Sequence, residues 1–246
     1  MLHPLFEKIW NEGEMPSDWR CGLLIKIPKK GDTAICNNWQ GITLLSIPSK
    51  VFTRILLNRI KEHVNQRLRK EQAGFRPNCS CVDQINTLRI IIEQCIEWSS
   101  RLYAVFVDFE KAFDSVNREA MWKEVKRYGV PTQIVDLIKE TYRGYVCRVV
   151  HEGRVSEPIP VRTGVRQGYI LSPIMFLIVI DAVMQNVTRD RRRGIRWGLV
   201  DRLDLDFADD FCLLSAAHSE MQTKIGDLIK EAGKVGLAIN VKKTRL

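Results

Sequence analysis

Two groups of aspartates that follow apolar strands constrain the fold more than any other feature of the sequence. The run 102–107 is apolar and rich in valine and aromatic residues, and it ends directly in Asp108. A run this short is typical of a buried strand rather than a helix. Apolar residues also flank Asp209 and Asp210, which predicts a hairpin over 203–214 with both carboxylates at its tip. Asp108 and Asp209 are 101 positions apart, so only a folded domain can bring them together.

The carboxylates have two interpretations. Adjacent carboxylates repel each other, so holding them at a tight turn costs free energy unless a cation neutralises them. Mg²⁺ prefers carboxylate oxygens and keeps water or substrate phosphate in its other positions. Two such ions, about 3.5–4 Å apart, stabilise the attacking and leaving oxygens of phosphoryl transfer. The structural alternative is that Asp-Asp favours a solvated turn and that Asp108 merely ends a strand. The residues alone leave both interpretations open.

Helical and strand-like segments alternate along the whole chain, which favours a mixed α/β or α+β fold. The expected strands are 23–27, 42–47, 102–107, 146–150, 154–161, 203–207, 211–214 and 237–239. The expected helices are 51–68, 82–97, two between 120 and 145, one that begins at 172, and one over 221–232. For the helix at 172, Ser172 is predicted as the N-cap and Pro173 as the first helical residue.

Charge and cysteine content narrow the class of partner. The chain has 38 Lys and Arg against 29 Asp and Glu, a net charge of +9, which favours a polyanionic partner. Its seven cysteines are spread out without a Cys-x-x-Cys pair, which favours reduced thiols in an intracellular protein. The longest apolar run stops at Asp181 and is too short to cross a bilayer. The N-terminus has no pattern of a secretory signal, and no Walker loop occurs.

Six motifs in chain order resemble those of reverse transcriptases from LINE-type (non-long-terminal-repeat) retrotransposons. The Phe-Ala-Asp-Asp sequence at 207–210 is similar to the catalytic Phe/Tyr-x-Asp-Asp box of reverse transcriptases. The six segments are 27–32 (IPKKGD), 72–77 (QAGFRP), 108–114 (DFEKAFD), 166–173 (RQGYILSP), 207–210 (FADD) and 236–244 (GLAINVKKT). Each motif alone is weak, but their collinear order is specific and covers essentially the whole chain.

The resemblance implies an α+β fold, the fingers and palm of a right-hand polymerase. We expect the fingers over residues 1–100 and the palm over 101–246, with part of 120–160 returning to the fingers. The family continues into a helical thumb, which is absent here because two residues follow Thr244.

The same resemblance assigns the metal ligands. Asp108 and Asp209 would be the main ligands of two Mg²⁺ ions, with Mn²⁺ as an alternative metal. Asp210 would be a weaker ligand, and the backbone carbonyl of Phe109 an additional one. Lys243 resembles the lysine that protonates departing pyrophosphate. The alternative without a functional role is a solvated surface lysine.

Further residues are implied to contact the nucleotide or the nucleic acid. Phe113 would stand against the sugar C2′ and exclude a 2′-hydroxyl, and Gln167 and Gly168 would lie against the nascent base pair. Their structural alternatives are a core phenylalanine and an ordinary loop. The implied basic and template contacts are Lys29 and Lys30 for the nucleotide, and Gly74 and Arg76 for the template or primer. Arginines at 189 and 191–193 form a further basic run that is either a nucleic-acid contact or a solvated loop.

Three residues depart from the family pattern. Gln40 replaces an arginine that resembles a triphosphate contact, and an amide supplies neither its charge nor its bidentate geometry. Cys79 replaces a basic residue, and Tyr169 occupies a position that is often small. Our hypothesis is a copy from a decaying element, with intact metal ligands and weakened nucleotide binding.

The sequence therefore predicts an RNA-directed DNA polymerase that adds a deoxynucleotide to a primer 3′-hydroxyl. Its partners would be an RNA template, a DNA primer and a dNTP, with no membrane. The thumb and the endonuclease of the element would lie elsewhere in a polyprotein, and the protein would act in the nucleus or the cytoplasm. A non-catalytic nucleic-acid-binding remnant is the competing class, and another palm-fold nucleotidyltransferase such as a cyclase is a third.

Overall fold

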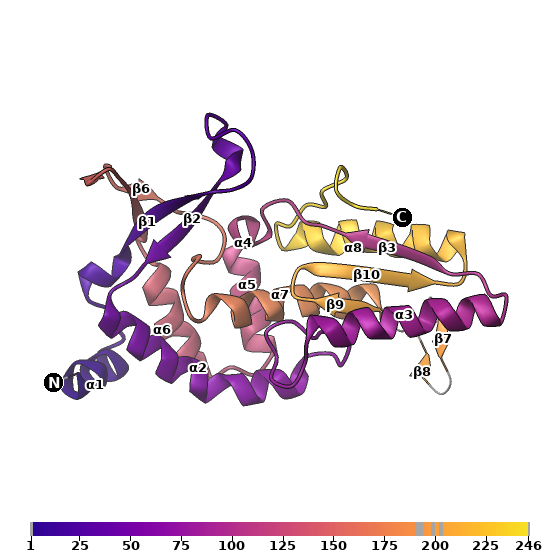
Figure 1. The fold of residues 1–246 in the computed structure, drawn as a ribbon. Coiled ribbons are helices and arrows are strands. Elements are labelled where there is room, and N and C mark those ends of the chain that lie inside the picture. Colours follow the sequence, from indigo (N-terminus) through magenta and orange to yellow (C-terminus); the bar gives the residue numbers. More distant parts are fainter. Residues whose placement is uncertain (1, 190–193, 198–199, 202–203, 246) are drawn as a thin grey trace.

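The computed structural model of the chain describes residues 2–189, 194–197, 200–201 and 204–245 (Figure 1). The helices are α1 His3–Glu12, α2 Ile47–Arg67, α3 Cys81–Glu97, α4 Ala112–Ser115, α5 Arg118–Arg127, α6 Thr132–Tyr142, α7 Ser172–Val187 and α8 His218–Lys234. The strands are β1 Cys21–Pro28, β2 Trp39–Leu44, β3 Tyr103–Val107, β4 Val146–His151, β5 Arg154–Val155, β6 Ile159–Pro160, β7 Arg196–Trp197, β8 Val200–Asp201, β9 Leu205–Phe207 and β10 Asp210–Ser215. Among these helices, none has the length and hydropathy needed to span a bilayer.

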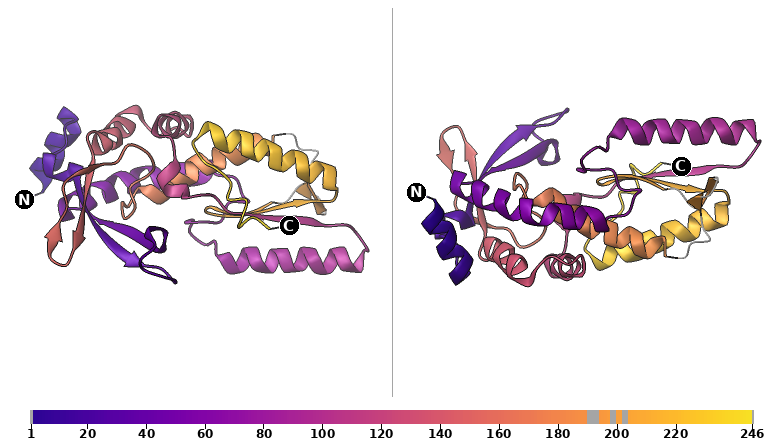
Figure 2. Two further views of the ribbon diagram at one scale, coloured as in Figure 1. Left: turned by 90° about the horizontal axis from the view of Figure 1, so that it is seen from above. Right: turned by 90° about the horizontal axis from the view of Figure 1, so that it is seen from below.

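The sheet that carries the aspartates is antiparallel, with the order β3-β10-β9. Figure 2 shows α8 and α3 on opposite sides of β3 and β10. The alternation along β10 explains this arrangement, since Phe211 and Leu213 join the core around α7 and α8, whereas Cys212 and Leu214 pack with Ile91 of α3. Because both faces of β10 are covered, its sequence is a continuous apolar run instead of an alternating one.

Helix α7 is the centre of the core. Its residues from Met175 to Met184 are all buried, and it packs against α5 and α8. A helix that is apolar on all sides is stable only when other elements surround it. It shares one apolar core with Val105 and Val107 of β3 and with Phe211 and Leu213 of β10.

A second sheet has the order β2-β1-β4-β5, and β6 also pairs with β4. Strands β1 and β2 are antiparallel, whereas β1 and β4 are parallel. The segment 146–160 therefore joins the sheet formed by residues 21–44, which lies to one side of β3, β9 and β10 in Figure 1. The division into fingers 1–100 and palm 101–246 stays a prediction.

Three predicted elements differ in the structure. The strand expected over 42–47 is β2, which ends at Leu44, because Ser46 caps α2 by accepting a hydrogen bond from the Ser49 amide at 3.4 Å. The strand expected over 154–161 is two short strands, β5 and β6. The strand expected over 237–239 is reduced to one bridge between Ile239 and Phe109.

The predicted cap of α7 is also wrong. Ser172 is the first helical residue and Leu171 is the N-cap residue. The Ser172 hydroxyl instead donates to the carbonyl of Arg166 at 2.7 Å and fixes the preceding loop. A serine before a proline is a typical cap signal, but here tertiary contact with the loop outcompetes local capping.

Candidate active site

The two groups of aspartates meet at one end of the β3-β10-β9 sheet. Strands β9 and β10 are joined by Ala208 and Asp209, and Phe207 pairs with Asp210, which is the first residue of β10. We call residues 205–215 the aspartate hairpin. Phe211 pairs with Val107, so one step further along the same ladder Asp108 faces Asp210. The structure thus brings Asp108 together with Asp209 and Asp210, which are 101 and 102 positions further along the chain.

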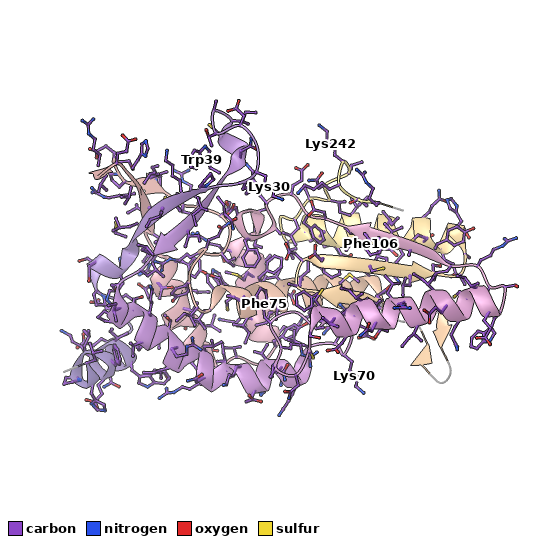
Figure 3. The ribbon with its side chains drawn as sticks, in the orientation of Figure 1. Lys30, Trp39, Lys70, Phe75, Phe106 and Lys242 are labelled. Carbon is purple, nitrogen blue, oxygen red and sulfur yellow. The ribbon has the colours of Figure 1, made fainter. Side chains whose placement is uncertain are left out.

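A cavity of about 360 Å³ lies beside these carboxylates, between α3 and the sheet. Asp108, Asp210 and Lys243 are its polar residues at one end, and Phe106 and Ile85 are among its apolar lining. Phe106 is half exposed on this face of β3 (Figure 3). The carboxylates therefore border a space that a ligand can enter.

The site carries negative charge that its protein contacts do not balance. Burial raises the pKa of Asp209, and repulsion from Asp210 and Asp108 acts in the same direction. One carboxylate oxygen of Asp108, Oδ2, is buried and accepts no hydrogen bond. Its nearest cation is Lys243 Nζ at 3.4 Å, whose side chain is 70% exposed. Unpartnered carboxylate oxygens are donors of the kind that divalent cations take.

The metal cluster is not preassembled. Across the residues that the structure describes, no group of three or more His, Cys, Asp or Glu side chains is arranged to hold an ion. The carboxylates fit a cation by their chemistry and by the unpartnered Asp108 oxygen, whereas their final arrangement would form around the ion.

The segment after α8 delivers Lys243 to the aspartates. The carbonyl of Asp108 accepts from the Asn240 amide and the carbonyl of Ala238 accepts from the Glu110 amide, both at 2.8 Å. The turn that follows Asn240 then returns the chain to β3 with Lys243 beside Asp108. These hydrogen bonds do not use the carbonyl of Phe109, which was predicted as a ligand, and the Phe109 ring packs edge-on against Phe211.

The predicted nucleotide residues on the palm side form a second group. Phe113 is half buried and stacks on Phe176, with ring centroids 4.5 Å apart and an angle of 16° between the planes. Gln167 donates from its side chain to Asp114 at 3.0 Å. Gly168 has φ +86°, and a Cβ there would lie 2.4 Å from the carbonyl oxygen of Thr43. The loop at 167–168 therefore joins the Phe113 segment to β2.

Lys29 and Lys30 lie beside the other large sheet, which contains β1 and β2. Both are exposed in the loop that follows β1, and the Lys29 amide donates to the Asn38 carbonyl at 2.7 Å (Figure 3). Gln40 is exposed on β2, opposite Ile27, and Cys79 is exposed as well. Of the basic run, only Arg189 falls within the described residues, and 190–193 lie outside them.

Tyr169, which occupies a position that is often small in the family, has its side chain in the core. Tyr169 is 2% exposed, and its hydroxyl donates to Thr141 Oγ1 at 3.1 Å in the core. Arg166 of the same motif is also buried, lies 3.8 Å above the centroid of the Tyr145 ring and donates to the Thr141 carbonyl at 3.0 Å. Both side chains support the loop from beneath.

Gly74 and Arg76, predicted to contact the template or primer, make intramolecular contacts in this structure. A Cβ at Gly74 would lie 2.2 Å from the Ala208 amide nitrogen, so the segment passes directly against the aspartate hairpin. Arg76 donates to the carbonyls of Arg69 and Gln72 at 2.7 and 2.8 Å. Their template role stays a prediction.

The comparison with known proteins settles the family. The family described as reverse transcriptase (RNA-dependent DNA polymerase) matches residues 27–246. The chain belongs to the reverse transcriptase family. The polyprotein of the type-2 retrotransposable element R2DM from Drosophila melanogaster is 26% identical over 231 residues, which cover 94% of this chain and 22% of that protein. The R2 polyprotein of Nasonia vitripennis is 29% identical, with 94% and 22% covered.

The solved structures agree with this reverse transcriptase fold. Apo telomerase from Candida tropicalis, truncated from its C-terminal domain, superposes with a TM-score of 0.68 at 15% identity and covers 98% of this chain and 54% of that one. The predicted α+β fold of polymerase fingers and palm is confirmed, as is the resemblance to LINE-type retrotransposon enzymes. The chain spans about a fifth of the length of the two polyproteins, 22% of each.

Sequence reasoning missed a buried network of ion pairs and hydrogen bonds that includes Asp206 of the aspartate hairpin. Arg69 donates from Nε to Asp181 Oδ1 at 2.8 Å and from Nη2 to Asp206. Tyr128 donates to Asp181 at 2.5 Å. Burial raises the pKa of Asp206 to about 7, although Arg69 opposes this shift. The available signal was Asp181 itself, since a carboxylate in an otherwise apolar helix requires a buried partner.

Proposed function

We propose that this chain is the polymerase centre of an RNA-directed DNA polymerase, which adds a dNTP to a primer 3′-hydroxyl. The observation that carries the proposal is the meeting of Asp108 with the aspartate hairpin inside a chain of the reverse transcriptase family. One buried carboxylate oxygen of Asp108 accepts no hydrogen bond and has only the ion pair with Lys243. Its net charge of +9 supports a nucleic-acid partner.

Asp108 and Asp209 would hold two Mg²⁺ ions, with Asp210 and the Phe109 carbonyl as additional ligands and Mn²⁺ as an alternative metal. When bound, such ions supply charge stabilisation for the oxygens that attack and leave phosphorus. Repulsion among the three carboxylates raises the free energy of the site without a cation, which supports cation binding. Lys243 lies beside Asp108 and would give its proton to the departing pyrophosphate.

The second group of residues would bind the nucleotide. Phe113 is held by its stack on Phe176, so a ring in this place rejects a 2′-hydroxyl by overlap. Gly168 has no Cβ, so its loop passes directly against the backbone of Thr43 in β2, and both Gln167 and Gly168 would lie against the nascent base pair. Lys29 and Lys30 would contribute positive charge to the triphosphate from the exposed loop after β1.

The chain would work as part of a larger assembly. The partners would be an RNA template and a DNA primer, with a thumb and an endonuclease supplied by other parts of a retroelement polyprotein in the nucleus or the cytoplasm. The length of the R2 polyproteins supports this proposal, since the match covers 22% of each. A telomerase from Candida tropicalis with the same fold is described in complex with a fragment of telomeric RNA.

A remnant that binds nucleic acid without turnover is the second candidate function. Gln40 favours it, because an exposed amide replaces the expected arginine. The lack of a preassembled metal cluster among the described residues favours it as well.

Metal binding separates the two candidates. Binding of Mn²⁺ can be followed by the loss of the free-ion signal in electron paramagnetic resonance. We expect binding by the wild type, loss in Asp108→Asn and Asp209→Asn, and retention in Asp136→Asn, which removes an exposed carboxylate from α6. A wild-type protein that binds a template–primer duplex but no Mn²⁺ would support the remnant.

A further inference from the structure

A buried glutamine from a distant segment holds the tip of the aspartate hairpin. Gln72 is fully buried, and its side-chain amide makes three hydrogen bonds. Its Oε1 accepts from the backbone amides of Ala208 and Gly74, each at 2.8 Å. Its Nε2 donates to the carbonyl of Ala208 at 3.2 Å. One side chain therefore satisfies both polar backbone groups of the residue that precedes Asp209.

Ala208 needs such a partner. Its φ is +58°, in the left-handed region that residues with a Cβ rarely adopt, and it is 5% exposed. A backbone conformation of this kind persists only where the surroundings hold it. Because water does not reach the buried Ala208 amide and carbonyl, loss of the Gln72 amide would leave both groups unpaired.

The segment around Gln72 is itself fixed on two sides. The Ala73 amide donates to the Asp206 carbonyl at 2.8 Å, and Gln72 forms a single parallel bridge with Asp206 of β9. On the other side, Arg76 donates to the Gln72 carbonyl at 2.8 Å and to Asn65 Oδ1 of α2 at 2.7 Å. Gly74 allows this contact, because no Cβ fits between the segment and Ala208. The long helix α2 is thus connected to the turn that carries Asp209.

We propose that Gln72 is a positioning residue that sets the Asp209 carboxylate for cation binding. Gln72 contacts neither substrate nor metal and acts through Ala208. The amide group matches the task, because it offers an acceptor for two N–H groups and a donor for one carbonyl. The consequence for metal binding rests on the proposed polymerase function, whereas the contact itself does not.

Amide hydrogen exchange measured by NMR tests the contact without any assay of activity. In Gln72→Met, which keeps the side-chain length, the Ala208 and Gly74 amides should both exchange about tenfold faster than in the wild type. The matched control is Gln133→Met, because Gln133 of α6 donates to the carbonyl of Trp10 at 3.2 Å, on a part of the molecule outside the aspartate hairpin. Unchanged exchange of both amides in Gln72→Met, or an equal effect in the control, would overturn the proposal.

Mn²⁺ affinity tests the consequence. We expect binding to folded Gln72→Met to be about tenfold weaker than to the wild type, as for other residues that orient metal ligands. A purely structural Gln72 would lower the melting temperature and leave the affinity of the folded protein unchanged, which contradicts the proposal. If Gln72→Met does not fold, Gln72→Glu keeps the acceptor, loses the donor when ionised, and should weaken Mn²⁺ binding as well. Absence of Mn²⁺ binding by the wild type would refute the proposed function, and the exchange experiment would still decide the contact.

Discussion

The residues around Asp108 divide by the direction in which their side chains point. Asp108, Asp210 and Lys243 face a common cavity, whereas Arg166, Tyr169 and Arg76 point into the protein and bind backbone or hydroxyl groups. A motif residue can thus be required for the site without contacting a substrate.

Gln40→Arg should raise the rate of primer extension. Gln40 is exposed on β2 and pairs with Ile27 of β1, shortly before the exposed Lys29 and Lys30. An arginine at position 40 therefore adds positive charge where the triphosphate is proposed to bind. Gln222→Arg places the same charge on the exposed surface of α8 and serves as the control. If both variants behave like the wild type, Gln40 is not the cause of weak nucleotide binding.

Phe113→Val should relax the choice of sugar. The stack on Phe176 fixes the ring, and valine removes that rigid surface. The ratio of ribonucleotide to deoxynucleotide incorporation, measured at equal concentrations, should rise by at least about tenfold, a loss of about 1.4 kcal/mol of discrimination. An unchanged ratio would show that Phe113 has only a packing role.

At this scale the sequence predicted the carboxylates but not the direction of the other polar side chains. Asp108 and Asp209 follow apolar strands, and strand periodicity determines where they lie. An arginine has the same sequence signature whether it contacts a phosphate or a carbonyl. The buried positions of Arg166 and Tyr169 depend on packing between segments far apart in the chain.

Among the secondary-structure elements, the network around Arg69 joins the end of α2 to α7 and β9. Arg69→Met would leave Asp181 and Asp206 buried without their cation and should lower the free energy of unfolding by about 3–5 kcal/mol. Urea denaturation measures this change. Arg89→Met, which removes an exposed arginine paired with Glu93 on α3, should have almost no effect, and an equal loss in both variants would contradict the account.

The same network predicts a pH dependence of stability. The pKa of Asp206 is raised to about 7 by burial and by Asp204 and Asp181, against the opposing effect of Arg69. The folded state therefore binds the proton more tightly than the unfolded chain, whose Asp pKa is about 3.9. This contribution to stability is complete below about pH 4 and is lost as the pH rises through about 7. Asp206→Asn should reduce the fall in unfolding free energy between about pH 5 and 8, and an unaltered slope would contradict the raised pKa.

The elements themselves were largely predictable, because their apolar periodicity is strong. The helix over 82–97 and the strand over 102–107 are α3 and β3 within one residue at each end. The errors occur where one contact decides a boundary, as for Ser172, whose hydroxyl binds the Arg166 carbonyl. The strand predicted over 237–239 is wrong, because the segment makes a single bridge, to Phe109 just after β3, before the chain turns at Asn240.

On the scale of the whole molecule, the two larger sheets carry different parts of the proposed site. The sheet with β1, β2 and β4 carries the exposed Lys29, Lys30 and Gln40, and the sheet with β3 and β10 carries the aspartates. Helices α2 and α7 lie between them in Figure 1. The apolar runs beside Asp108, Asp209 and Asp210 predicted the strands that carry them, whereas the link through Gln72 became visible only in the structure, since no local pattern distinguishes a buried glutamine.

Primer extension on an RNA template of mixed sequence tests the central claim most directly. The assay uses the protein with Mg²⁺ and all four dNTPs, and the product is sequenced. The account predicts DNA complementary to the template and no extension by Asp209→Asn. A protein that binds the template–primer duplex but adds no nucleotide in the presence of Mg²⁺ would contradict it.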